Sequence, residues 1–172
     1  MRGCEKFKRK VIWARKCEIR KVEGFREFFE NYHINGCGRG DCFGLFLNGR
    51  MLSAIQVRRT PSNEDSDDGS FILDRYAVVF HYNVAGGIER LMRYAERALN
   101  IKKWISYADI TVSDGALYRR LGFDLILRSN PDYKYIYNGK RVHKFNFRIK
   151  RFKEDLDLLY EEGMTEQQLA EL

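Results

Sequence analysis

The sequence predicts one mixed α/β domain, and three observations support this fold class. Residues 71–80 form a run rich in β-branched and aromatic side chains, long enough for a central strand. A glycine-containing turn follows at 83–87, and apolar residues then recur at steps of three and four over 88–99, the spacing of a helix with one buried stripe. Asn-Gly pairs at 48–49 and 138–139 each separate two strand-like runs and predict hairpins. The predicted sheet is therefore mixed, with the glycine turn near its middle.

The composition is that of one globular domain. With 172 residues, 44% of them hydrophobic, the chain can form one core but is too short for two domains of ordinary size. Its mean hydropathy of −0.51 and the lack of any apolar run near ~18 residues exclude a membrane-spanning helix. The basic N-terminus is not followed by an apolar segment, so we expect no signal peptide and a cytoplasmic protein.

Positive charge dominates the chain and is concentrated near its two ends. The net charge is +7 and the pI is about 9.3. Nine Lys and Arg residues against two Glu lie in residues 1–21, and eight Lys and Arg with no acidic residue lie in 134–153. This distribution favours acidic partners such as nucleic acid, CoA-type phosphates or anionic surfaces.

The cysteines favour free thiols. Cys4, Cys17, Cys37 and Cys42 show no Cys-x-x-Cys spacing, and nothing in the sequence indicates secretion. His33 could join Cys37 and Cys42 around a metal, but three ligands at this irregular spacing make a poor zinc signature. We therefore expect no metal site.

The elements before the central strand follow from local patterns. We expect a strand over residues 11–19 and a helix whose apolar stripe runs from Val22 to Tyr32. Residues 42–57 predict a hairpin with a type I′ turn. The polar stretch 61–69 predicts a solvated loop.

The elements after the central helix are shorter. We expect a strand over 104–109, a short helix over 116–121 that Ser113-Asp114-Gly115 caps, and a further strand over 123–128. The remaining expected elements are a second hairpin over 133–148, a helix over 150–162 and a capping box at 165–168.

The order of these elements and one local motif resemble the GNAT acyltransferase superfamily. The motif is Leu117-Tyr118-Arg119-Arg120-Leu121-Gly122-Phe123, and it follows a strand, a Gly-Gly turn, a helix and a strand. The resemblance covers about residues 11–148 and implies a GNAT-like fold with a central, mostly antiparallel sheet flanked by helices. It divides the chain into a basic arm (1–10), a GNAT-like domain (11–149) and a helical extension (150–172).

A narrower resemblance is to phage proteins, namely Mom-like DNA-modification GNATs and the GNAT-like domain of phage homing-endonuclease-like proteins. It implies DNA as a partner. Six short motifs in the same order carry it: His33-Ile34-Asn35-Gly36, Leu73-Asp74-Arg75, Asn83-Val84-Ala85-Gly86-Gly87, Ser106-Tyr107-Ala108-Asp109, Gly115-Ala116-Leu117-Tyr118 and Pro131-Asp132-Tyr133-Lys134-Tyr135.

The GNAT resemblance implies a donor, acetyl-CoA or another acyl-CoA, bound at the glycine turn. Two glycines let the backbone approach a ligand, and the free amides of a helix start bind phosphate. Arg90 or Arg93 would add positive charge. Ser113 either contacts CoA or only caps the helix that follows. The turn residues expected to bind the cofactor are Val84, Ala85, Gly86, Gly87 and Ile88.

Four side chains are candidates for the chemistry, and backbone amides at the end of the central strand would face the oxyanion. Tyr118 matches the family's Tyr that protonates the departing thiolate, and a phenol with a pKa near ~10 suits that step. Asp109 and His33 are candidates for the base or for orienting the acceptor, although either could be structural. Arg75 lies in an apolar run and needs a partner. That partner is a ligand or Asp109, because Asp74 should point to the opposite face of the strand.

Aromatic and basic residues alternate in the segment 133–152. Bases can stack on aromatic rings while Lys and Arg contact phosphates, so this segment is a candidate nucleic-acid surface. The alternative is a hairpin with an aromatic inner face and a solvated basic outer face. The residues expected to bind nucleic acid are Tyr133, Lys134, Tyr135, Lys140, Arg141, Lys144 and Arg148.

These features favour a phage-type GNAT-fold transferase that modifies a nucleic-acid amine, such as that of a DNA base, with a CoA thioester as donor. Two alternatives stay open. One is acetylation of a protein or small-molecule amine. The other is a non-catalytic DNA-binding module, because the glycine turn lacks the leading Arg or Gln and the final small residue of the usual acyl-CoA loop.

Overall fold

The computed structural model describes residues 9–61, 68–110, 112–128, 133–137, 139–144, 164, 165 and 168. The chain divides into two compact units, Met1–Phe123 and Asp124–Leu172. The expected basic arm lies almost wholly outside the described residues, and so does the expected boundary at 149–150, which stays a prediction. Within the described part of the chain, no helix is long and apolar enough to cross a membrane.

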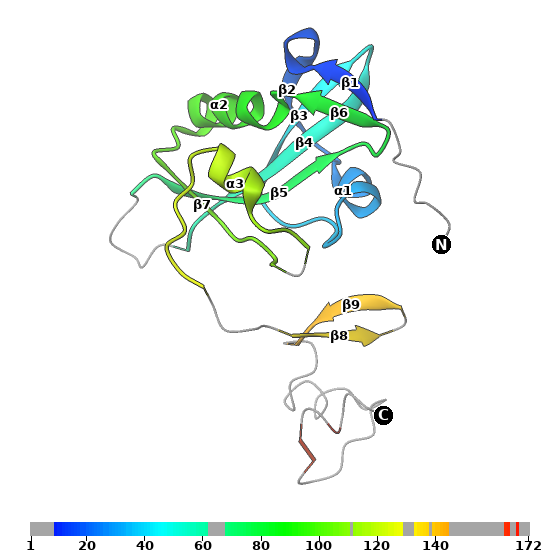
Figure 1. The fold of residues 1–172 in the computed structure, drawn as a ribbon, viewed down its shortest axis with the longest axis vertical. Coiled ribbons are helices and arrows are strands. Elements are labelled where there is room, and N and C mark those ends of the chain that lie inside the picture. The colour runs from blue at the N-terminus through cyan, green and yellow to red at the C-terminus, as the bar shows by residue number, and fades with distance from the viewer. Residues whose placement is uncertain are drawn as a thin grey trace. The chain divides into compact units, whose positions relative to one another are not determined.

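The first unit is built on a five-stranded sheet (Figure 1). Its strands pair antiparallel except for the last, which runs parallel to its neighbour, so the expected mostly antiparallel sheet is confirmed. In spatial order the strands are β2 (Glu18–Val22), β3 (Asp41–Leu47), β4 (Arg50–Arg59), β5 (Ser70–Val78) and β7 (Lys103–Ser106). The turn between β3 and β4 has positive φ at both Asn48 and Gly49, as type I′ requires, so the first hairpin is confirmed.

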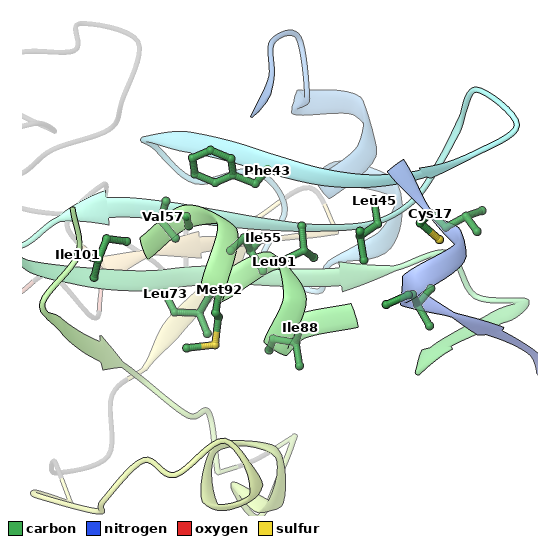
Figure 2. Close-up of a cluster of buried hydrophobic side chains, with 14 of the residues drawn as sticks. Cys17, Phe43, Leu45, Ile55, Val57, Leu73, Ile88, Leu91, Met92 and Ile101 are labelled. Atoms are coloured by element: carbon green, nitrogen blue, oxygen red, sulfur yellow. The ribbon is translucent and has the colours of Figure 1, made fainter. Parts of the chain in front are cut away.

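Two longer helices cover opposite faces of this sheet (Figure 1). On one face, α2 (Gly87–Leu99) buries Ile88, Leu91 and Met92 against residues such as Ile55, as Figure 2 shows. On the other face, α1 (Arg26–Tyr32) buries Phe28 and Phe29 against a separate cluster of small and apolar residues. Alternating residues of β3 and β4 divide between the two clusters, which gives each strand two buried faces.

A β-bulge interrupts the alternation in the middle of β5. Gln56 of β4 pairs with Arg75 while Val57 pairs with Leu73, so Asp74 is the extra residue. Ala77, which follows the bulge in the chain, lies on the α1 face. Leu73, which precedes the bulge, lies on the α2 face, although strict alternation would place both residues on one face. The bulge therefore brings Asp74 and Arg75 to the same face. The expectation that they point to opposite faces is wrong, because strict alternation fails at an extra residue.

The expected strand over 11–19 is two strands in different sheets. β1 (Lys10–Trp13) pairs in parallel with β6 (Tyr82–Ala85), and a 3-10 turn, η1 (Ala14–Lys16), separates it from β2. The expected helix start at Val22 is also wrong, because this residue pairs with Cys42 inside the sheet. Gly24, with φ of 66°, turns the chain into α1.

The segment after α3 (Ala116–Arg120) corrects another expectation. Residues 123–128 form no strand, although the sequence there is apolar enough for one. Leu125, Ile126 and Leu127 are 73%, 85% and 78% exposed. A short apolar run becomes a strand only beside a neighbour that pairs with it, and no described strand does so here.

In the second unit, the second hairpin is confirmed. Its strands are β8 (Lys134–Tyr137) and β9 (Lys140–His143), and Gly139 has the positive φ that the turn requires. The capping box is also confirmed. The amide of Thr165 donates to Gln168 Oε1 at 2.9 Å, and the amide of Gln168 donates back to Thr165 Oγ1 at 3.3 Å. The helix expected over 150–162 lies outside the described residues.

Candidate functional site

The start of α2 offers unpaired backbone amides. Gly86 is the N-cap, in a left-handed conformation, and no side chain caps the helix. The first helical hydrogen bond runs from the Arg90 amide to the Gly86 carbonyl at 3.2 Å. The amides of Gly87, Ile88 and Glu89 therefore have no partner within the helix. Such amides and the helix dipole favour negative charge at the start of a helix.

The two glycines have different structural roles. A Cβ on Gly86 would meet no atom within 4 Å, so its positive φ is the constraint there. A Cβ on Gly87 would lie 3.0 Å from Val84 Cγ1, so close packing is the constraint there. Val84 and Ile88 are both buried, so only their backbone could contact a phosphate. Ala85 is in β6 and pairs with Trp13.

A cleft of about 670 Å³ lies beside this turn, between α2 and the β1–η1–β2 segment. Ala85 and Gly86 line one end of it. Of the two arginines expected to add charge, Arg90 is already engaged, because its Nη1 donates to the carbonyls of Ala14 and Cys17. Arg93 lines the cleft. No local sequence pattern predicts this cleft, because its walls come from segments about 75 residues apart in the chain.

A second polar cluster lies on the α1 face, at the bulge of β5. Arg75 Nε donates to the Gly36 carbonyl at 3.2 Å, and its Nη1 lies 3.5 Å from Asp74 Oδ2. Arg58 Nε lies 3.3 Å from the other oxygen of Asp74. The side chains of Asp74 and Arg75 are only 14% and 21% exposed, so this ion pair is largely shielded from solvent. Arg75 thus has protein partners, and Asp109 is not among them within the described part of the chain.

The loop after α1 is held tightly over this cluster. The Gly38 amide donates to Oε1 of the fully buried Gln56 at 2.9 Å. A Cβ on Gly38 would collide with Asp74 Oδ2 and lie 3.0 Å from Gln56 Oε1. Only glycine fits at this position, so the loop backbone forms one wall of the cluster.

His33 belongs to the same cluster. It is the C-cap of α1, and its Nδ1 accepts a hydrogen bond from the Asn35 amide at 3.2 Å. Burial, helped by the nearby Arg75 guanidinium, lowers the pKa of His33 to about 4. The imidazole is therefore neutral at pH 7 and carries its proton on Nε2. This state suits a hydrogen-bond donor that orients an acceptor, and it makes His33 a poor general base.

The remaining candidates follow β7. Asp109 is exposed, and its carbonyl accepts from the amides of Val112 (3.1 Å) and Ser113 (3.0 Å). Ser113 Oγ accepts from the Gly115 amide at 3.2 Å, so its hydroxyl is used within the turn before α3. Tyr118 is half-buried in α3 and packs edge-on against Phe123, with ring centroids 5.7 Å apart.

The structure brings some candidates together and separates others. His33 and Arg75 interact on the α1 face. Tyr118 packs against the core on the α2 face, as Ile88 of the glycine turn does. At the edge of the sheet, where the α1 and α2 faces meet, β7 pairs with β5 only from Ser70 to Leu73. Past this point no described strand pairs with the β7-facing edge of β5.

The chain has the GNAT acetyltransferase fold. One structure that shares it is the aminoglycoside N-acetyltransferase AAC(6')-Iy in complex with CoA, which is 15% identical with a TM-score of 0.50 over 69% of this chain and 94% of that one. A possible acetyltransferase from Clostridium difficile 630 is 15% identical, with a TM-score of 0.50 over 70% of this chain and 99% of that one.

A third structure is an aminoglycoside acetyltransferase, meta-AAC0020, from an uncultured soil metagenomic sample in complex with sisomicin. It is 12% identical, with a TM-score of 0.50 over 70% of this chain and 98% of that one. No family model matches the sequence, and no curated protein is significantly similar to it. At these identities the GNAT likeness is one of fold, and it agrees with the element order that the sequence predicted.

The hairpin of the second unit contains most of the expected nucleic-acid residues. Tyr133 is 53% exposed and packs edge-on against Tyr135, with centroids 5.6 Å apart. Lys144 Nζ lies 5.0 Å from the centre of the Tyr133 ring. Lys134 and Lys140 are in the paired strands, Arg141 is opposite Ile136, and Arg148 lies outside the described residues. This arrangement leaves the hairpin's binding role a prediction.

The cysteines hold no disulfide among the described residues, where Cys17, Cys37 and Cys42 are free. Burial, together with the neighbouring Cys37, raises the pKa of Cys42 to about 12. Over the same residues, no three His, Cys, Asp or Glu side chains gather closely enough to hold a metal ion.

Proposed function

We propose that the chain is an N-acyltransferase that takes its acyl group from a CoA thioester. The observation that carries this proposal is the start of α2, where three amides follow a left-handed glycine and no side chain caps them. A Cβ on Gly86 would meet no atom within 4 Å and Gly86 lines the cleft, which supports an approach of the donor phosphates to these amides. The fold is shared with an acetyltransferase whose structure was determined with CoA.

The chemistry uses the open edge of β5 and the two faces that flank it. The bound thioester supplies an activated acyl carbonyl. Backbone N–H groups past Leu73, where β5 leaves β7, would stabilise negative charge on the carbonyl oxygen. As the amine nitrogen bonds to the carbonyl carbon, the C–S bond breaks, and the Tyr118 hydroxyl would give its proton to the sulfur. Asp109 would take the proton that the amine loses.

The acceptor would reach this edge from the α1 face. Neutral His33 can donate from Nε2, and Arg75 can turn part of its guanidinium toward an anionic or carbonyl group. We propose a nucleic-acid amine, such as that of a DNA base, as the acceptor. The net charge of +7 and the Tyr133–Lys144 contact on the hairpin support this choice.

Donor binding is tested by comparing two substitutions of Gly86 that differ only in charge. An Asp there places a carboxylate at the phosphate position, whereas an Asn has the same size without the charge. Both substitutions carry the same backbone cost at positive φ, about 1 kcal/mol. Titration calorimetry with acetyl-CoA should show binding at least about tenfold weaker for Gly86→Asp than for Gly86→Asn. Equal affinities, or no acetyl-CoA binding by the unchanged chain, would refute a donor at this turn.

The acceptor is tested by mass spectrometry of nucleosides. DNA and RNA from cells that express the chain should contain a nucleoside whose mass has risen by the acyl group. The Tyr118→Phe and Asp109→Ala variants should contain much less of it. Unchanged nucleosides alongside intact acetyl-CoA binding would overturn the nucleic-acid acceptor and leave acetylation of a protein or small-molecule amine. If neither a modified nucleoside nor acetyl-CoA binding is found, the result would indicate a non-catalytic module.

A further inference from the structure

We propose that the cleft between α2 and the β1–η1–β2 segment is a docking site for single-stranded nucleic acid. The proposal goes beyond acyl transfer, because a strand can dock on this surface whether or not a donor is bound. We call this surface the α2 cleft. It has a volume of about 670 Å³, and its charged and aromatic lining residues are Trp13, Arg15, Glu89, Arg90, Arg93, Tyr94 and Arg97.

The charge of the α2 cleft suits a polyanion. Arg15, Arg93 and Arg97 line it, and Glu89 is the only acidic lining residue. Arg93 and Arg97 are one helical turn apart, so their Cβ atoms are about 5–6 Å from each other on one stripe of α2. Both side chains are exposed, and no acidic residue in the described part of the chain forms an ion pair with either. Two unpaired guanidinium groups in a row can each contact a phosphate.

The aromatic wall of the α2 cleft suits a base. Trp13 is 55% exposed, which is unusual for so large an apolar side chain, and the guanidinium of Arg15 lies 5.7 Å from its ring centre. A base could stack on the open part of this ring. Tyr94 is less available, because it packs edge-on against the buried Phe43. Trp13 is therefore the expected stacking residue.

The α2 cleft is preformed. Both donor groups on Arg90 Nη1 go to carbonyls of the η1 turn, which ties α2 to the opposite wall. Residues 10–13 of that wall are also paired in register with residues 82–85, directly before α2. A ligand would therefore not have to order the walls when it binds, and that lowers the entropic cost of binding.

Further exposed cations lie in the chain on both sides of Trp13, and this favours a strand over a single nucleotide. Arg9 and Lys10 precede Trp13, Lys16 ends the η1 turn, and Arg20 follows in β2. Cations thus flank the stacking residue on both sides in the chain. An acidic peptide would match the charge but would not use the exposed indole ring as a base does. Nucleic acid is accordingly the partner that uses both features.

The charge prediction is tested with a fluorescein-labelled 12-mer of deoxythymidine and fluorescence anisotropy at several salt concentrations. Arg93→Gln/Arg97→Gln should bind at least about tenfold more weakly. Its slope of log affinity against log salt should be shallower by about 1.4, because each of the two phosphates that it no longer neutralises contributes ~0.7. The matched control is Lys102→Gln/Lys103→Gln, which removes the same charge from exposed residues just before and at the start of β7, outside the α2 cleft and the α1 face. Equal weakening in both double variants would reduce the effect to net charge and overturn the proposal.

The stacking prediction is tested by the fluorescence of Trp13. Trp104→Phe removes the only other tryptophan of the chain. The oligonucleotide should quench the remaining emission, and Trp13→Ala should weaken binding about tenfold. Lack of quenching would overturn stacking on this ring.

A third measurement identifies the occupant. Arg97→Gln, which keeps Arg93, should bind acetyl-CoA as the unchanged chain does, because Arg97 lies in the last turn of α2 and the proposed donor amides lie in its first turn. If this variant loses acetyl-CoA and keeps the oligonucleotide, the α2 cleft holds the nucleotide part of the donor and the docking proposal is wrong. Gly86→Asp should weaken acetyl-CoA binding more than oligonucleotide binding, because Gly86 lines only one end of the α2 cleft. Failure of the docking site and failure of the donor site are therefore distinguishable by which of the two variants loses which ligand.

Discussion

His33 couples the polar cluster of the α1 face to pH. Its pKa falls from 6.5 in the unfolded chain to about 4 in the folded one, so the unfolded state binds a proton first as pH falls. We expect stability to be full above about pH 6.5 and to decrease down to about pH 4. Because the imidazole is only partly buried and solvent screens it, the decrease should be roughly 1 to 2 kcal/mol. Urea unfolding between pH 4 and 7.5 measures it.

The control for this prediction is His33→Asn, which keeps a hydrogen-bonding side chain but does not titrate. Its stability should change less with pH across the same window, although carboxylates contribute a slope of their own below about pH 5. If the variant and the unchanged chain have parallel profiles, His33 is not the residue responsible.

The thiols should differ in reactivity. Burial raises the pKa of Cys42 to about 12, so its thiolate fraction at pH 8 is on the order of one in ten thousand. Cys37 is half-buried and packs against the apolar cluster of the α1 face that contains Cys42. Iodoacetamide at pH 8 should therefore label Cys37 well before Cys42, as peptide mass spectrometry would detect. Labelling of Cys42 at the rate seen in denaturant would contradict its burial.

At the residue scale, local sequence patterns predicted backbone conformation and capping hydrogen bonds better than the face of the sheet to which a side chain points. The positive φ of Asn48 and Gly49 follows from their identity, and so does the reciprocal bonding of Thr165 and Gln168. The side to which Asp74 points does not, because it depends on a bulge that forms only when β4 and β5 pair. The alternation of apolar and polar residues within β5 cannot predict a bulge that depends on how β5 pairs with β4.

At the element scale, Arg90 fastens the β1–η1 segment to α2. Arg90→Met should cost about 2 kcal/mol, because it leaves the carbonyls of Ala14 and Cys17 without their charged donor. Arg93→Met, one turn along the helix at an exposed position, should stay within about 0.5 kcal/mol of the unchanged chain. Chemical unfolding compares the two. Equal costs would mean that Arg90 acts through helix propensity or charge and not through the carbonyls.

The elements that the sequence placed wrongly are those defined by distant partners. The break at Ala14–Lys16 arises because β1 pairs with β6, about 70 residues later in the chain, while β2 pairs with β3. The strand expected over 123–128 lacks a neighbour among the described strands. The hairpins and the helix after the Gly86-Gly87 turn needed only adjacent residues, and the structure agrees with them. Local information was sufficient for local contacts alone.

At the scale of the whole first unit, the sheet separates the candidate residues into two groups. Tyr118 and the glycine turn belong to the α2 face, whereas His33 and Arg75 belong to the α1 face. The sequence predicted each residue but not this division, since faces are assigned only when strand order and register are known. The two faces meet where β7 stops pairing with β5 after Leu73. A donor and an acceptor could therefore approach one reaction centre from opposite sides.

This division makes the two proposed binding functions separable by mutation. Arg75→Gln removes a charge from the α1 face, and it should leave acetyl-CoA affinity within about twofold because the donor amides are on the other side of the sheet. The yield of modified nucleoside should nevertheless fall by about tenfold or more. Because Arg75 also pairs with Asp74, the variant's melting temperature must be measured alongside, with Arg58→Gln as a second change to the same carboxylate. If folded Arg75→Gln loses acetyl-CoA binding as Gly86→Asp does, the donor extends onto the α1 face and the assignment of one ligand to each face is wrong.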